Sequence, residues 1–115
     1  MLRPTRPISW INAARKDFAK FPIEAQWECR DALTIAAEGG KSELAKPLTG
    51  FGSGVFEIAL TYKGDAFRVV YAVLLNEDVW VSHAFQKKSK HGIQTPKPEI
   101  DLIKEPIKRL KEAMK

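Results

Sequence analysis

The chain has 115 residues, which fits a single domain over residues 1–115 with one modest hydrophobic core. Its 44% hydrophobic and 29% charged residues exclude wholesale disorder, and the lone Cys29 excludes an internal disulfide. A net charge of +5 favours RNA, DNA or an acidic protein as partner. No apolar run approaches the ~20 residues that cross a bilayer, so we expect a cytoplasmic protein without membrane contact.

The first third of the chain is predicted to be helical after a short strand. We expect residues 6–10 to form an edge strand. Apolar residues at helical spacing then predict a helix over 12–21, capped by Asn12 and ended by Pro22. A second helix is expected over 23–38, and the two should form a hairpin.

The middle of the chain changes to a period of two. Residues 41–54 are rich in Gly and Pro and predict an irregular connection. Beyond them, alternating apolar residues and tight turns predict a three-stranded antiparallel meander over residues 56–62, 67–75 and 79–85. If the large side chains face the helices, Glu57 and Arg68 lie on the other face, where they could pair.

A C-terminal helix is predicted from Pro98, with one apolar stripe formed by Ile100, Ile103, Ile107 and Leu110. Pro106 interrupts this stripe. Because a proline within a helix loses a hydrogen bond, we expect a kink or a restart near Glu105. Together the elements predict an α+β fold.

The stretch with the greatest excess of positive charge is residues 83–98, which hold both histidines, four lysines and no carboxylate. We expect the strand to become a mobile basic loop at about Phe85. Such a loop would suit a polyanion.

These residue types could cleave RNA without a metal or other cofactor. Cations can stabilise the pentacoordinate phosphate, for which the candidates are Arg68, Lys87, Lys88 and Lys90. A histidine can carry a proton, and the candidates are His83 and His91. Phe85 could stack on a base, and Lys97 and Glu57 complete the candidate RNA-binding residues.

Each candidate also has a plain structural interpretation. Lysine runs are usually solvated, His83 could be a hydrogen-bonded strand residue, and Arg68 could simply pair with Glu57. Phe85 would more commonly be a core residue. The tryptophans are most simply packing residues, which applies to Trp10, Trp27 and Trp80, and Cys29 should be a buried, inert thiol.

Several runs resemble one known family: residues 45–48, 55–58 and 67–71, then His83-Ala84-Phe85-Gln86-Lys87-Lys88-Ser89-Lys90 with Thr95-Pro96. The chain resembles the phage-derived Gp49-like, HigB-type branch of the RelE/ParE toxin superfamily. The segment from His83 is fairly specific to this branch, whereas the arginine-bearing strand is common to the superfamily.

The resemblance implies a toxin of a type II toxin–antitoxin pair, with two N-terminal helices packed on a small twisted antiparallel sheet and a C-terminal helix. It implies ribosome-dependent mRNA cleavage that inhibits translation. On this reading Arg68 matches the family's strand arginine near the scissile phosphate, and Lys87 and Lys88 match the branch's basic signature. The implied partners are a HigA-like antitoxin with a helix-turn-helix domain, and the ribosome with mRNA.

Two other functions stay open at this point. The ParE side of the superfamily implies a non-enzymatic inhibitor of DNA gyrase. Alternatively, the chain is an inactive relative that only binds nucleic acid, with its lysines releasing counterions. The sequence leaves the general base, the codon preference and the antitoxin's binding mode undetermined.

Overall fold

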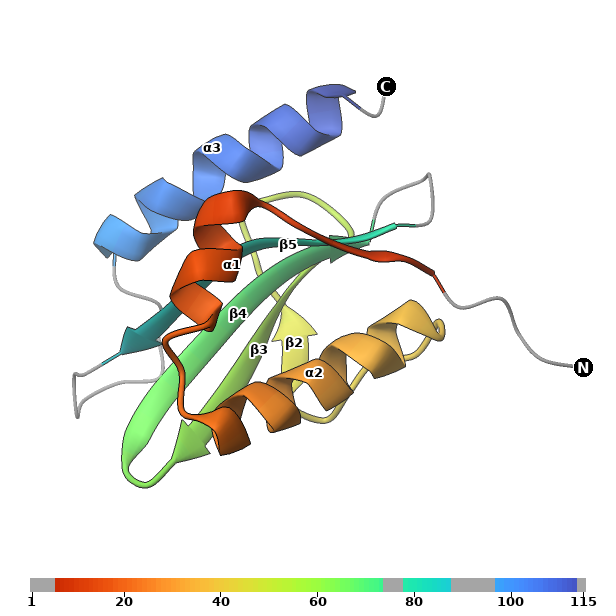
Figure 1. The fold of residues 1–115 in the computed structure, drawn as a ribbon. Helices are drawn as coiled ribbons and strands as arrows, with labels where there is room; N and C mark the ends of the chain where they lie inside the picture. Colours follow the sequence, from red (N-terminus) through yellow and green to blue (C-terminus); the bar gives the residue numbers. More distant parts are fainter. Residues whose placement is uncertain (1–5, 74–77, 88–96, 114–115) are drawn as a thin grey trace, which may run out of the picture.

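The computed structural model describes residues 6–73, 78–87 and 97–113. Within these ranges, two helices precede most of the sheet and a third follows it (Figure 1). The helices and strands in chain order are β1 (Ile8–Trp10), α1 (Asn12–Phe18), α2 (Ile23–Ala37), β2 (Ala45–Pro47), β3 (Val55–Tyr62), β4 (Asp65–Val73), β5 (Val79–Lys87) and α3 (Lys97–Ala113). The predicted α+β class is confirmed.

In the described part of the chain, the sheet has five strands in the order β1-β5-β4-β3-β2. Strands β3, β4 and β5 form the predicted antiparallel meander, and β1 is the predicted edge strand, although it pairs in parallel with β5. Residues 41–54 were expected to be irregular, which left only the three strands of the meander beside the edge strand. This expectation was wrong, because β2 lies within residues 41–54 and pairs with β3. At three residues including Pro47, β2 is too short to produce an alternating pattern.

Helices α1 and α2 cover one face of the sheet, and α1 packs chiefly on β5 while α2 packs on β3 (Figure 1). The two helices therefore rest on the sheet more than on each other. Three aromatic rings link them to β4, with centroids 5.3 Å apart for Phe18 and Phe21 and 4.8 Å for Phe21 and Phe67. These rings anchor the connection between the helices in the main core.

The ends of the first two helices differ in part from expectation. Asn12 is the first helical residue, and Ile11 is the N-cap without a side-chain cap bond. Helix α1 ends at Phe18, three residues before the expected Phe21, which is nevertheless buried. Helix α2 begins and stops almost where predicted, followed by Gly39 with a φ of 94°.

Helix α3 lies on the opposite face of the sheet, where Ile103 and Ile107 pack on a small second core formed by Val55, Val70 and Ala72. The helix is continuous from Lys97 to Ala113 with Pro106 inside it, so the expected restart near Glu105 does not occur. Burial of the stripe on both sides of Pro106 supplies the packing free energy that offsets the lost hydrogen bond.

The expectations for Cys29 and Trp27 have opposite outcomes. Cys29 is buried in α2 as predicted, and burial raises the pKa of its thiol to about 12. Trp27 is 60% exposed, so the prediction that it is a packing residue is wrong.

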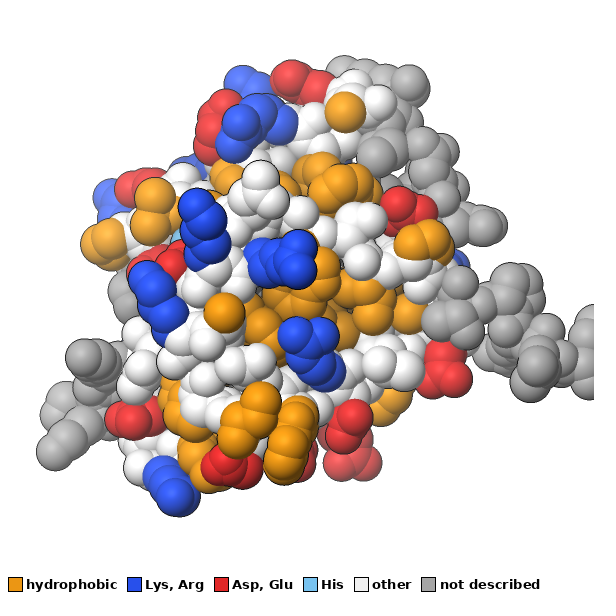
Figure 2. All heavy atoms as spheres, in the orientation of Figure 1, with side chains coloured by type: hydrophobic (Ala, Val, Ile, Leu, Met, Phe, Trp, Pro, Cys, Tyr) orange, Lys and Arg blue, Asp and Glu red, His pale blue; other side chains and the backbone are white. Residues whose placement is uncertain are grey.

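Figure 2 shows apolar and acidic side chains together over α2, with basic side chains gathered nearer α1. Among the described residues, no helix has the length and apolarity to span a bilayer.

Candidate functional site

A β-bulge decides which side chains of β5 face α3. Val81 pairs with Tyr71 and His83 pairs with Val70, so Ser82 has no partner in the ladder. The extra residue inverts the alternation. Before it, Val79 and Val81 point into the core under α1 and α2, and after it Ala84 does so instead.

The inverted alternation places the functional candidates of β5 beside Arg68. Phe85 is the direct cross-strand partner of Arg68, and Lys87 pairs with Ala66 two residues away. Directly paired residues share a face and diagonal neighbours lie ~7–8 Å apart. Arg68 and Lys87 are therefore neighbours on the side of the sheet that carries α3.

This cluster of charge is buried. Arg68 is 6% exposed, Lys87 7% and Glu57 1%. The expected pair between Arg68 and Glu57 exists, with 3.8 Å between Nε and Oε1. Arg68 also donates from Nη1 to the carbonyl oxygen of Phe67 at 3.3 Å, while its Nε has no hydrogen-bond partner in the described part of the chain.

The expectation of a loop from Phe85 onward is thereby corrected. Strand β5 continues through Lys87, and the Lys87 side chain lies against the protein instead of on a mobile loop. A strand position next to Ala66 and close to Arg68 gives this lysine a defined direction. Phe85 is also buried, which agrees with its structural interpretation, although its face is the one that carries the charges.

His83 connects β5 to the first turn of α3. Its Nε2 lies 2.7 Å from Oε2 of Glu99, and both side chains are partly buried. The ring of His83 also lies against Phe85, with centroids 5.4 Å apart. A neutral imidazole that donates from Nε2 to the carboxylate keeps Nδ1 as an acceptor.

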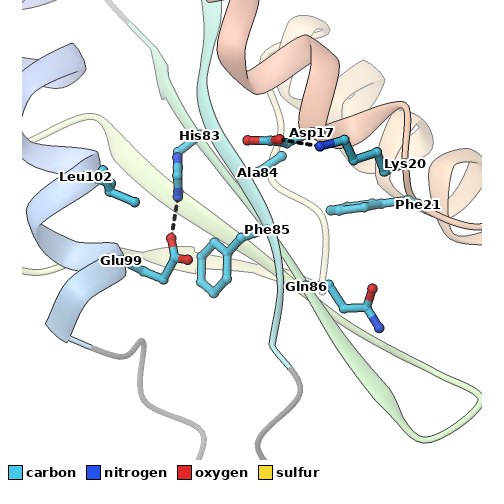
Figure 3. Close-up of a pocket in the computed structure, with 9 residues that line it drawn as sticks. All are labelled: Asp17, Lys20, Phe21, His83, Ala84, Phe85, Gln86, Glu99 and Leu102. Carbon is cyan, nitrogen blue, oxygen red and sulfur yellow. Dashed lines mark hydrogen bonds and ion pairs between the residues drawn. The ribbon is translucent and has the colours of Figure 1, made fainter.

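A pocket of about 290 Å³ opens beside this pair, across β5 and between α1 and α3 (Figure 3). Figure 3 shows His83, Phe85 and Glu99 on the α3 side of the strand, with Asp17, Lys20 and Phe21 across it on the α1 side. The pocket thus combines aromatic surface, a cation and a carboxylate–imidazole pair, the groups that bind and act on polar ligands.

The remaining sequence candidates divide into two groups. Lys88, Lys90 and His91 lie outside the described residues. Lys97 is the first residue of α3, exposed, and two positions from Glu99. The structure thus brings together Arg68, Lys87, Phe85, Glu57 and His83 on one side of the sheet.

Sequence reasoning missed Glu99 and Ser82. Glu99 is an acid in the first turn of α3, a position that ordinarily indicates only a helix start, so nothing local pointed to His83. Ser82 gave no signal because β5 is apolar on both sides, and a bulge is visible in sequence only where alternation is clean.

The solved structures that resemble this one include two that contain toxins. A double mutant of the toxin RelE from E. coli, in the free state, superposes with a TM-score of 0.65 at 18% sequence identity, over 92% of this chain and 98% of that chain. The toxin–antitoxin complex RelBE2 from Mycobacterium tuberculosis has a matching chain with a TM-score of 0.50 at 17% identity, over 74% of this chain and 94% of that one. At these identities the likeness establishes a shared fold.

Among curated proteins, none matches this sequence. The family described as "Phage derived protein Gp49-like" matches residues 16–108, which is most of the chain and includes β3, β4, β5 and the start of α3. The fold is that of RelE toxins, and the family predicted from the sequence is confirmed. The chain belongs to the phage-derived Gp49-like family.

Proposed function

We propose that this chain is the toxin of a type II toxin–antitoxin pair and cleaves mRNA on the ribosome in the cytoplasm. The observation that carries the proposal is the placement of Arg68, Lys87 and His83 on one side of the sheet. Membership of the Gp49-like family and the RelE fold support it. Its partners would be an antitoxin with a helix-turn-helix domain, and the ribosome with mRNA.

The proposed reaction is an internal transesterification. The ribose 2′ oxygen attacks the adjacent phosphorus and gives up its proton, the bond from phosphorus to the 5′ oxygen breaks, and the 5′ oxygen takes a proton. A 2′,3′-cyclic phosphate and a 5′ hydroxyl result. Arg68 and Lys87 would stabilise the extra negative charge on the phosphorane. His83, held by Glu99, would carry one of the two protons.

Burial sets a condition on this chemistry. Arg68 and Lys87 are too enclosed in the free chain for both to touch an RNA backbone. Cleavage therefore requires a rearrangement over this face, and α3, which lies there and is joined to β5 by His83 and Glu99, is the described element that would shift. Binding to the ribosome would supply both this rearrangement and the alignment of the message.

The same burial favours a second candidate function. Glu57, Arg68 and Lys87 would also be explained as a structural charge cluster within a protein-binding module, such as a non-enzymatic gyrase inhibitor. An inactive relative that only binds nucleic acid would give the same cluster. These functions differ from the leading one in what happens to cellular RNA.

Primer extension on mRNA from cells that express the chain separates these functions. Discrete cuts in frame with translation support the leading proposal, and DNA damage with intact transcripts supports gyrase inhibition. If neither cuts nor DNA damage are found, nucleic-acid binding is the function that remains.

The variant Lys87→Met removes the charge of the lysine but retains most of its aliphatic volume. This variant should therefore fold, and it should not cleave mRNA. Lys108→Met removes an exposed charge from α3 and is the matched control. Equal cleavage by both variants would refute the placement of the site.

A further inference from the structure

An apolar patch lies on the solvent side of α2. Trp27 is 60% exposed and Ile23, one helical turn earlier, is 51% exposed. Residues four apart share a helix face, so the two side chains form one surface. Thr34 lies seven residues after Trp27 and extends this face toward the C-terminal end of α2. An exposed tryptophan is uncommon, and tryptophan is enriched where proteins bind one another.

The charge around this patch has the opposite sign to that of the whole chain. Helix α2 carries Glu24, Glu28 and Asp31 with one basic residue, whereas the chain has a net charge of +5. Glu28 and Asp31 are exposed and take part in no ion pair with a described residue. Figure 2 shows acidic and apolar side chains close together over α2.

The single base of α2 does not neutralise this surface. The guanidinium of Arg30 lies over the rings of Trp10 and Phe18, at 5.9 Å and 5.3 Å from their centroids. It is thus directed to the flank of the helix that meets β1 and α1. The patch around Trp27 keeps its acidic character.

This combination selects one class of partner. Carboxylates repel a nucleic-acid backbone and an anionic membrane surface, which leaves a protein. A two-fold dimer through this face would oppose Glu28 and Asp31 of one copy to the same residues of the other, which costs repulsion. A segment with lysine or arginine around an apolar patch complements both the charge and the tryptophan.

We propose that the α2 face, defined as Ile23, Trp27, Glu28, Asp31 and Thr34, is the docking surface for a basic, apolar segment of the antitoxin. The identity of the partner rests on the proposed function. Because α2 and α3 cover opposite faces of the sheet, this segment binds without touching His83 or Arg68 (Figure 1). Neutralisation then comes from the bulk of the bound partner, which keeps the toxin off its large target.

Binding measurements with the full chain and the antitoxin that neutralises it test the docking surface. Trp27→Ala should raise the Kd roughly 30-fold or more, which is the range found for interface hot spots. The double variant Glu28→Lys, Asp31→Lys should slow association and flatten its dependence on salt. Leu102→Ala, at 58% exposure on α3, is the matched control and should leave the Kd unchanged.

Thiol footprinting of the complex gives a second readout that does not depend on weakened binding. Cys29 is buried, with its thiol pKa raised to about 12 by that burial, so an introduced cysteine reports alone. Thr34→Cys should become protected from a thiol reagent in the complex, while Leu102→Cys should stay reactive. Protection at Leu102→Cys instead would overturn the proposal.

The outcomes separate this inference from the proposed function. If the chain is toxic, but neither Trp27→Ala nor the charge reversal changes its affinity for the antitoxin, the docking surface alone is refuted. A chain that is not toxic and has no neutralising partner refutes both. Self-association that Trp27→Ala abolishes would assign the face to a second copy and overturn the antitoxin assignment.

Discussion

The imidazole of His83 has two close neighbours that limit its possible roles. Its Nε2 is bonded to Glu99 at 2.7 Å, and its ring packs near Phe85. The sequence left open whether this histidine is structural or catalytic. The geometry does not choose between the two roles, because the bond to Glu99 fixes the ring through Nε2 and does not use Nδ1. Only a variant that retains the fold can separate the two roles.

Removal of the imidazole should therefore affect cleavage more than folding. On the proposed function, His83→Ala should lower the cleavage rate by roughly 10²–10⁴-fold, the usual contribution of a general acid or base. Glu99→Gln keeps a hydrogen-bonding group but loses the charge, so the rate should fall by a smaller factor. Asp101→Asn, an exposed carboxylate two residues later, is the control. An unchanged rate in Glu99→Gln would show that this residue does not position the histidine.

The buried thiol of Cys29 makes stability sensitive to alkaline pH. Burial raises its pKa from 9.0 to about 12, so above pH 9 the unfolded chain loses a proton that the folded chain keeps. The free energy of unfolding must then fall as pH rises from 9 toward 12, by at most about 1.4 kcal/mol per pH unit for one group. Urea unfolding of Cys29→Ala should show a shallower decline over this range than the parent chain. Parallel declines would contradict the assignment.

At the scale of elements, β5 and α3 organise the site together. The bulge at Ser82 turns His83, Phe85 and Lys87 toward α3, and α3 returns Glu99 to meet His83. Helix α3 is held at its other end by Lys111, whose Nζ donates to the carbonyl oxygens of Phe51 at 2.7 Å and Ser53 at 3.3 Å. The helix is therefore attached at both ends, with a small core between.

Loss of the C-terminal attachment should loosen α3 selectively. Lys111→Met removes both donors and should lower the free energy of unfolding by roughly 1 kcal/mol. Hydrogen exchange should speed up in α3 more than in β4. Lys108→Met replaces an exposed lysine in the same helix and should leave the hydrogen exchange of α3 unchanged.

Gly52→Ala should loosen α3 in the same way as Lys111→Met. The new methyl group would collide with the Lys111 ammonium, and Gly52 has a φ of +85°. Unchanged exchange in Lys111→Met would show that the side chain does not hold the helix.

At the scale of the whole molecule, the sheet separates two surfaces of different character. One side carries α3 and the enclosed cations Arg68 and Lys87, and the other carries the acidic and apolar face of α2. On the proposed function, the chain would bind a protein partner and an RNA target on opposite sides of the sheet. Arg68 and Lys87 are nevertheless almost fully buried in the structure.

The proposed function therefore predicts a dependence on the ribosome. The purified chain should cleave naked RNA poorly, because Arg68 and Lys87 are 6% and 7% exposed. Addition of translating ribosomes programmed with the same message should raise the rate by orders of magnitude, since alignment alone contributes large factors. Parallel assays with and without ribosomes measure this. Equal rates in the two assays would show that the free chain is already open.

Local pattern predicted much of this fold. Helix α2 has its predicted start and face, and β3 and β4 follow the alternation that put Glu57 and Arg68 on the side away from α1 and α2. The pair between those two charges was expected for the same reason. These features depend on residues close in sequence or directly paired across one turn.

Periodicity and local motifs were sufficient to predict the α+β class, the Gp49-like family and the candidate charges. The other features required the packing of the whole chain. The Ser82 bulge, the parallel pairing of β1, the reach of Glu99 to His83 and the exposure of Trp27 all depend on elements distant in sequence. A local pattern cannot specify which of two apolar faces is covered, and the sheet with its three helices makes that choice.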